Sequence, residues 1–206
     1  MSNYTYEFEN RGERLETYEW DNVWWEHAKT EGVPRVLYIG DSISCGTRKI
    51  ATAAAEERIF FDGFGTSKAL DNPYFAESLH LFAEQQGGRR AVLFNNGLHG
   101  WHLCDETDYV REYEKMIGFL LREFAGTPIL LLLSTHLADP ARDARVQARN
   151  RGVVALAEKY GLPVVDLYAL TAAHADLLLG DGVHWTPEGY RLIADELIRR
   201  VEPYLS

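Results

Sequence analysis

The sequence predicts one three-layer α/β/α domain built on a mostly parallel sheet of five strands. Three observations lead to this prediction. Short apolar runs alternate along the chain with longer stretches of helical periodicity. The runs are continuously apolar, which is typical of parallel strands covered on both faces. With 206 residues, the chain has the length of one such domain and needs no internal boundary.

Each predicted element rests on local patterning. The five strands are expected at residues 35–39, 59–61, 91–94, 129–133 and 164–167. Apolar residues at helical spacing, together with helix-start and helix-stop residues, predict helices at about 43–57, 73–86, 108–124, 140–160 and 187–201. Residues 62–68 are rich in turn formers and are predicted to form a loop.

The first 31 residues are predicted to form an acidic, aromatic arm outside a domain that spans residues 32–206. Trp20, Val23, Trp24 and His27 have the spacing of one short amphipathic helix. We expect this arm to dock on the domain and to bury its tryptophans. A platform on which a sugar stacks is the alternative interpretation.

Charge and composition exclude several classes of partner. The formal charge is −10, from 21 basic and 31 acidic residues, which argues against a nucleic-acid partner. No segment approaches the roughly 20 apolar residues of a membrane helix. The first residues lack the features of a signal peptide, and two cysteines do not make a disulfide framework. The expectation is a soluble, cytoplasmic protein without a membrane partner; its oligomeric state is not predicted.

A buried-type strand runs directly into Gly40, Asp41 and Ser42. In an open α/β fold this turn lies at the carboxyl edge of the sheet, where ligands bind. The amides that open the next helix favour negative charge at the same place, which suits a nucleophile whose attack creates an oxyanion. The alternative is an ordinary turn in which Asp41 or Ser42 caps the helix.

Asp181 precedes His184 by three residues in a predicted turn before the last helix. This spacing can place a carboxylate on one imidazole nitrogen and leave the other free to face a nucleophile. Ser42 follows the first strand and His184 follows the last, so both are expected at the same sheet edge. The prediction is Ser42 as nucleophile, His184 as general base and then acid, and Asp181 fixing the tautomer. A polar surface turn that caps the last helix is the alternative for Asp181 and His184.

Gly40-Asp41-Ser42-Ile43 and Asp181-Gly182-Val183-His184 resemble the first and last motifs of the SGNH (GDSL-type) hydrolases. The resemblance covers about residues 34–204. It implies a flavodoxin-like α/β/α fold and an esterase or lipase activity that proceeds through an acyl-enzyme intermediate, without a metal or cofactor.

The same resemblance implies an oxyanion hole with three hydrogen-bond donors. Two are the amides of Ser42 and of a glycine after the second strand, for which Gly65 is the candidate and Gly63 the alternative. The third is an asparagine in a Gly-x-Asn-Asp motif, which Asn-Asn-Gly-Leu-His replaces here. Aligning the glycines puts His99 in the position of that asparagine, and shifting the alignment puts Asn96 there. Either side chain can donate a hydrogen bond to an oxyanion.

Asp41, Trp101 and Trp185 are the candidates for contacts with the substrate. No long apolar stripe accompanies the motifs, and aromatic residues near them suit a sugar. The prediction is an esterase that removes a short acyl group, most of all acetyl, from a carbohydrate or other small polar alcohol. A lysophospholipase or thioesterase is one alternative, and a non-catalytic carbohydrate-binding or phosphate-binding module is another.

His99, His102 and Asp105 stand at three-residue spacing, as metal ligands on a helix can. Elsewhere in the sequence, no residues stand out as further ligands that would complete such a metal site. Metal binding is therefore not the expected role of these residues.

Overall fold

The computed structural model describes residues 8–9, 16 and 18–205. Its centre is a six-stranded sheet in the order β3-β5-β4-β6-β7-β8. The strands of this sheet are β3 (Asp21–Trp24), β4 (Arg35–Gly40), β5 (Phe60–Thr66), β6 (Ala91–Phe94), β7 (Ile129–Leu132) and β8 (Val164–Val165). Five of them, β4 to β8, pair in parallel, and β3 is antiparallel to β5. A separate pair joins β1 (Phe8–Glu9) to β2 (Tyr18–Glu19).

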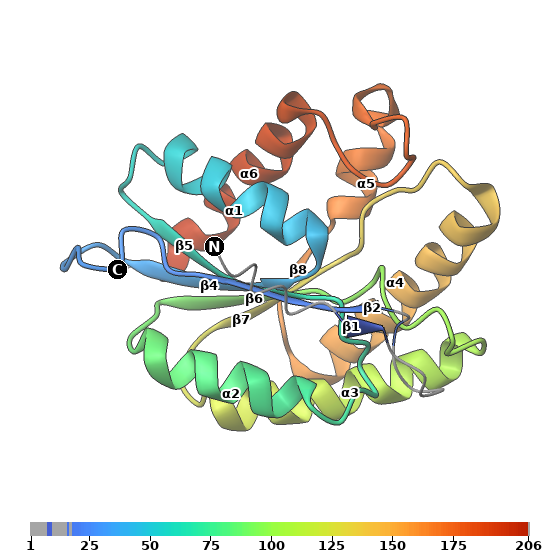
Figure 1. Ribbon diagram of the computed structural model, residues 1–206, viewed down its shortest axis with the longest axis horizontal. Coiled ribbons are helices and arrows are strands. Elements are labelled where there is room, and N and C mark those ends of the chain that lie inside the picture. Colours follow the sequence, from blue (N-terminus) through green and yellow to red (C-terminus); the bar gives the residue numbers. More distant parts are fainter. Residues whose placement is uncertain (1–7, 10–15, 17, 206) are drawn as a thin grey trace.

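Helices cover both faces of the sheet (Figure 1). They are α1 (Ser42–Ala54), α2 (Phe75–Gln86), α3 (Glu106–Glu123), α4 (Pro140–Tyr160), α5 (Leu167–Ala172) and α6 (Pro187–Val201). α1 and α6 pack on one face, where Val36 and Tyr38 of β4 enter the core. α2 and α3 pack on the other face, where Leu37 and Ile39 of the same strand lie in the core. This arrangement confirms the predicted three-layer α/β/α class, with one strand more than expected.

The additional strand comes from a segment that was expected to be helical. Trp20, Val23 and Trp24 have helical spacing, yet residues 21–24 form β3 at the open edge of β5. So short a run does not distinguish the helical repeat of apolar residues from the strand repeat. The backbone hydrogen-bonding groups on the edge of β5 favour a strand here. As an edge strand, β3 leaves Val23 and Trp24 about 40% exposed (42% and 40%), while Trp25 stacks on Phe82.

The loop expected at residues 62–68 is also a correction, because β5 continues to Thr66. Its glycines make room for α1. A Cβ on Gly63 would lie 2.4 Å from Cδ of Arg48, and one on Gly65 would lie 2.3 Å from Sγ of Cys45. Glycines inside a strand often mark such a close approach, and here they allow α1 to pack against β5.

The predicted ends of α4 and α6 agree with the structure. Asp139 and Thr186 cap their first turns, each followed by a proline, and Gly161 ends α4 in a left-handed conformation (φ 65°). α5 is a short helix in a segment for which no helix was predicted. Among the described residues, no helix is both long enough and apolar enough to cross a membrane.

Candidate active site

The turn between β4 and α1 presents Ser42 as the first residue of the helix. Asp41 caps that helix, since its Oδ1 accepts a hydrogen bond from the amide of Ile43 at 2.8 Å. The Asp41 side chain is used in this cap, and the residue is only 2% exposed. It therefore supports the nucleophile turn from inside the protein, in contrast to the expectation that it contacts the substrate.

Ser42, His184 and Asp181 lie in a hydrogen-bonded row. Nε2 of His184 is 2.9 Å from Oγ of Ser42, although the two residues are 142 positions apart in the chain. Nδ1 of the same ring is 2.7 Å from Oδ2 of Asp181. The parallel sheet makes this meeting possible, because the segments that follow β4 and β8 begin at the same edge.

Asp181 is held as a carboxylate by donors in its own turn. Its Oδ1 accepts from the amides of Val183 and His184, each at 2.9 Å. These hydrogen bonds, first of all the one from the His184 amide, lower the pKa of Asp181 to about 2. Gly182 forms the turn with a positive φ of 70°. The carboxylate is consequently ionised at any pH near neutrality and can orient the imidazole.

The loop after β6 is held by a buried guanidinium group. Arg149 of α4 is 1% exposed and donates to the carbonyl oxygens of Gly97, His99 and Gly100 at 3.3, 2.8 and 2.9 Å. Its Nε also bonds Glu106. Arg149 could not be identified from the sequence, because an arginine on a polar helix carries no signal that distinguishes it from a surface residue.

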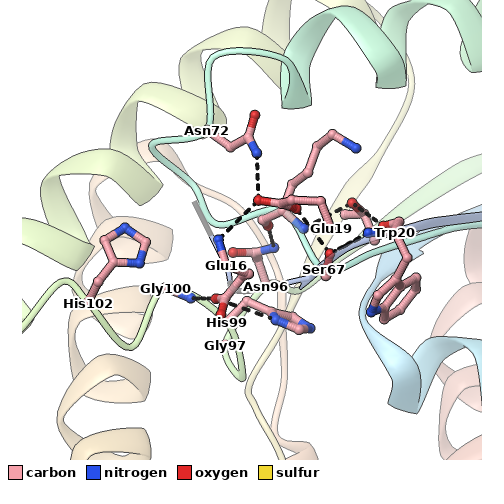
Figure 2. Close-up of polar contacts among 12 residues, drawn as sticks. Glu16, Glu19, Trp20, Ser67, Asn72, Asn96, Gly97, His99, Gly100 and His102 are labelled. Atoms are coloured by element: carbon pink, nitrogen blue, oxygen red, sulfur yellow. Dashed lines mark hydrogen bonds and ion pairs between the residues drawn. The ribbon is translucent and has the colours of Figure 1, made fainter. Parts of the chain in front are cut away.

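Asn96 and His99, the two candidates for the third oxyanion donor, have different surroundings (Figure 2). Asn96 is fully buried, and its Nδ2 donates to the carbonyl oxygen of Lys68 at 2.8 Å. The His99 side chain is 18% exposed, and its Nδ1 lies 3.6 Å from Oε1 of Glu16. Its ring also stands edge-on to Trp20, with 6.1 Å between centroids. The amide of Asn96 thus already has a main-chain partner, whereas the imidazole of His99 meets a charged side chain.

The two candidate glycines lie at different levels of β5. Gly65 is in register with Gly40, the last residue of β4, and with Asn22 of β3. Gly63 is in register with Tyr38, two residues deeper in the sheet. Gly65 is therefore the one beside the nucleophile turn.

The two tryptophans expected at the substrate pocket are not open stacking surfaces. Trp185 is 1% exposed and belongs to the core cluster of α1 and α6, which corrects the expectation for this residue. Trp101 is half-buried. Three guanidinium groups lie within 5.2 Å of its ring centre, from Arg142, Arg145 and Arg149.

His102 and Asp105 have structural partners. Nε2 of His102 lies 3.0 Å from Asp71, and Asp105 caps α3 by accepting from the amide of Thr107. Within the described part of the chain, no group of three or more His, Cys, Asp or Glu side chains is arranged to hold a metal ion.

Solved structures with the same fold include several esterases. A lipase/acylhydrolase from Enterococcus faecalis superposes with a TM-score of 0.66 at 16% identity, over 84% of this chain and 98% of that one. An acetyl xylan esterase, Axe2, from Geobacillus stearothermophilus gives 0.64 at 17% identity, over 82% and 94%. The catalytic domain of peptidoglycan O-acetyltransferase A from Streptococcus pneumoniae gives 0.65 at 16% identity, over 84% and 94%. At these identities the similarity shows the fold.

Sequence comparison identifies the family. No curated protein matches the chain significantly. The profile of the GDSL-like lipase/acylhydrolase family, however, matches residues 38–192, which include Ser42 and His184 and three quarters of the chain. The chain belongs to the GDSL-like lipase/acylhydrolase family.

Proposed function

We propose that the protein is a serine esterase that removes short acyl groups, most of all acetyl, from a carbohydrate or another small polar alcohol. The observation that carries this proposal is the row of hydrogen bonds from Ser42 through His184 to Asp181, at 2.9 and 2.7 Å. A serine hydroxyl becomes a nucleophile when a base takes its proton, and this row supplies both the base and the group that orients it.

The reaction has two halves that share the same base. In the first, His184 takes the hydroxyl proton while Oγ of Ser42 bonds to the ester carbonyl carbon. The tetrahedral intermediate collapses to an acyl-serine, and His184 gives its proton to the departing alcohol. In the second, His184 takes a proton from water, the hydroxide attacks the acyl-serine, and the carboxylic acid leaves as the proton returns to Ser42.

Three donors are proposed to stabilise the oxyanion. The amide of Ser42 opens α1, where the helix dipole favours negative charge. Gly65 is the proposed second donor because it lies level with Gly40 at the end of β4. We assign the third position to His99, whose side chain is 18% exposed, because Asn96 is fully buried and one proton of its side-chain amide goes to the carbonyl oxygen of Lys68 at 2.8 Å.

The names of neighbours with the same fold support a short acyl group. Two are acetyl xylan esterases and one is a peptidoglycan O-acetyltransferase. An acetyl ester of a carbohydrate fits these names.

The test is hydrolysis of p-nitrophenyl esters of increasing chain length by the wild type, Ser42→Ala and Ser44→Ala. Ser44 is the matched control, because it lies on the same helix and its Oγ donates to the carbonyl of Asp41 at 2.7 Å. We expect activity on acetate and butyrate that Ser42→Ala abolishes and Ser44→Ala retains. Activity that rises with chain length would instead identify a lipase or thioesterase, and hydrolysis that survives Ser42→Ala would overturn the mechanism.

A further inference from the structure

We propose that one buried water molecule binds beside the nucleophile turn, between the carboxylate of Asp41 and the hydroxyl group of Thr135. Through this water, Thr135 is a positioning residue for Ser42, which Asp41 places at the start of α1. The positioning role rests on the proposed esterase function, whereas the water site itself does not.

A small cavity lies at the carboxyl edge of the sheet, next to the turn that carries Ser42. Its volume is about 10 Å³, and its lining includes Asp41, Asn95, Ser134 and Thr135. These residues follow the ends of β4, β6 and β7, which are neighbouring strands in the sheet. A volume of this size is about the room that one water molecule requires.

One oxygen of the Asp41 carboxylate needs a partner in this region. Oδ1 accepts a hydrogen bond from the amide of Ile43 at 2.8 Å, whereas Oδ2 is buried and has no hydrogen-bond partner among the described residues. Asp41 is only 2% exposed, so bulk solvent does not reach it. Leaving a buried carboxylate oxygen unpaired is costly, and an ordered water is a common partner for such a group.

Two hydroxyl groups in the lining of the same cavity can supply hydrogen-bond donors. Oγ1 of Thr135 is buried and has no partner in the described part of the chain, and the residue is 2% exposed. Oγ of Ser134 accepts from Nδ2 of Asn95 at 3.1 Å, which leaves its own proton for a second partner. A water in the cavity accepts both hydroxyl protons and donates one of its own to Oδ2 of Asp41. It then makes three hydrogen bonds, about the number that is typical of a buried water.

The water connects the loop after β7 to the start of α1. Asp41 caps this helix through Oδ1, so the orientation of its carboxylate determines the geometry of the first helical turn. A water on Oδ2 fixes that orientation and keeps Oδ1 on the amide of Ile43. Ser134 is itself held by Asn150, which accepts from its amide at 2.9 Å and donates to its carbonyl oxygen at 3.0 Å. The nucleophile turn is thereby tied to a fixed part of the neighbouring loop.

A crystal structure of the wild type tests the water site directly. We expect one solvent peak in the cavity, about 2.5–3.0 Å from Oδ2 of Asp41, Oγ1 of Thr135 and Oγ of Ser134. Thr135→Val keeps the shape of the side chain but removes its hydroxyl group, so the peak should disappear in that variant. A cavity without density in a map that shows other internal waters would overturn the proposal. A direct hydrogen bond from Thr135 to Asp41 would overturn it as well.

Steady-state kinetics on p-nitrophenyl acetate test the positioning role. We expect Thr135→Val to lower kcat about tenfold with KM nearly unchanged, because Ser42 and His184 are then less precisely aligned. Thr135→Ser keeps the hydroxyl group and should retain most of the wild-type kcat. Thr52→Val is the matched control, since Thr52 is 3% exposed and its Oγ1 accepts from the amide of Phe61 at 3.0 Å, near the other end of α1. It should lower the melting temperature but leave kcat unchanged.

The outcomes separate this inference from the proposed function. A wild-type kcat in Thr135→Val overturns the positioning role, and so does a Thr135→Ser variant as slow as Thr135→Val. An equal loss of kcat in Thr52→Val would show a general effect of removing a buried hydroxyl group and also overturns it. If the wild type shows no hydrolysis that depends on Ser42, the proposed function fails and the positioning role fails with it. The solvent peak still decides the water site in that case, so the two failures can be told apart.

Discussion

Replacing Asp181 by Asn tests the orienting group of the proposed triad with the smallest possible change of shape. The side chain keeps its size, but it loses its charge and gains an NH₂ group. The structure determines which way the new amide must turn. The amides of Val183 and His184 both donate to Oδ1 at 2.9 Å, so the oxygen of Asn has to occupy that position. The NH₂ group then faces Nδ1 of His184, where Oδ2 of Asp181 now lies at 2.7 Å.

The expected loss follows from that orientation. An NH₂ group facing Nδ1 requires a lone pair on that nitrogen, so the proton of the neutral ring moves to Nε2. Nε2 can then no longer accept the proton of Ser42. In a buried triad the wrong tautomer costs about 10⁴-fold in kcat. The Asp181 side chain is 50% exposed, so water competes for part of the interaction, and we expect a loss of about 10³-fold.

Steady-state kinetics on p-nitrophenyl acetate measure this loss. kcat and kcat/KM should fall together, because the interaction matters in the transition state more than in substrate binding. A variant that keeps more than a tenth of the wild-type kcat would show that Asp181 does not orient the base.

The same variant has a predictable pH dependence of stability. The hydrogen bonds lower the pKa of Asp181 from 3.8 to about 2, so the carboxylate stabilises the fold above pH 4. This contribution disappears as the pH falls through about 2. The difference in melting temperature between the wild type and Asp181→Asn should therefore narrow as the pH falls from 4 towards 2. A difference that widens over this range would contradict the assigned shift.

Two further predictions concern packing around the site. Gly65→Ala should destabilise the protein by about 1–3 kcal/mol in urea unfolding, because its Cβ would lie 2.3 Å from Sγ of Cys45. Cys45→Ala should make the glycine replacement less costly, and purely additive effects would argue against this contact. Arg149→Ala should cost about 3–5 kcal/mol, since removing this buried guanidinium leaves the carbonyl oxygens of Gly97, His99 and Gly100 without their donor, at about 1–3 kcal/mol each. Arg145→Ala, whose side chain is 30% exposed, should cost about 1 kcal/mol or less, and equal losses would be inconsistent with the clamp.

The elements that could be predicted are those whose signals are local. Buried parallel strands are continuous apolar runs, and prolines with preceding cap residues mark the starts of α4 and α6. The approach of Ser42 to His184 over 142 positions also followed from two local motifs, since parallel strands bring their carboxyl ends to one edge.

What could not be predicted depends on contacts between distant segments. β3 is a strand because β5 offers a free edge, and nothing within residues 21–24 records that edge. β5 continues through Gly63 and Gly65. At these two positions Arg48 and Cys45 of α1 occupy the space that a larger residue's side chain would need. A sequence shows the glycines as turn formers, while the structure shows them as places of close packing.

The candidate substrate residues illustrate the same limit. Trp185 follows His184 directly in the chain, yet it is 1% exposed while the His184 side chain is 37% exposed. Neighbours in an extended turn point in opposite directions, so proximity to a motif does not place a side chain in the site. Glu16 and Arg149 are the reverse case, because they reach the loop after β6 from segments 84 and 50 residues away in sequence.

The proposed mechanism requires Ser42 to be the nucleophile, and covalent labelling identifies the nucleophile directly. The protein is incubated with phenylmethylsulfonyl fluoride, digested, and the modified peptide is identified by mass spectrometry, with His184→Ala as the comparison. We predict one sulfonyl group per chain on Ser42, formed in parallel with the loss of esterase activity and much more slowly in His184→Ala. Labelling at another residue with loss of activity, or full activity in a protein whose Ser42 is completely modified, would contradict the mechanism.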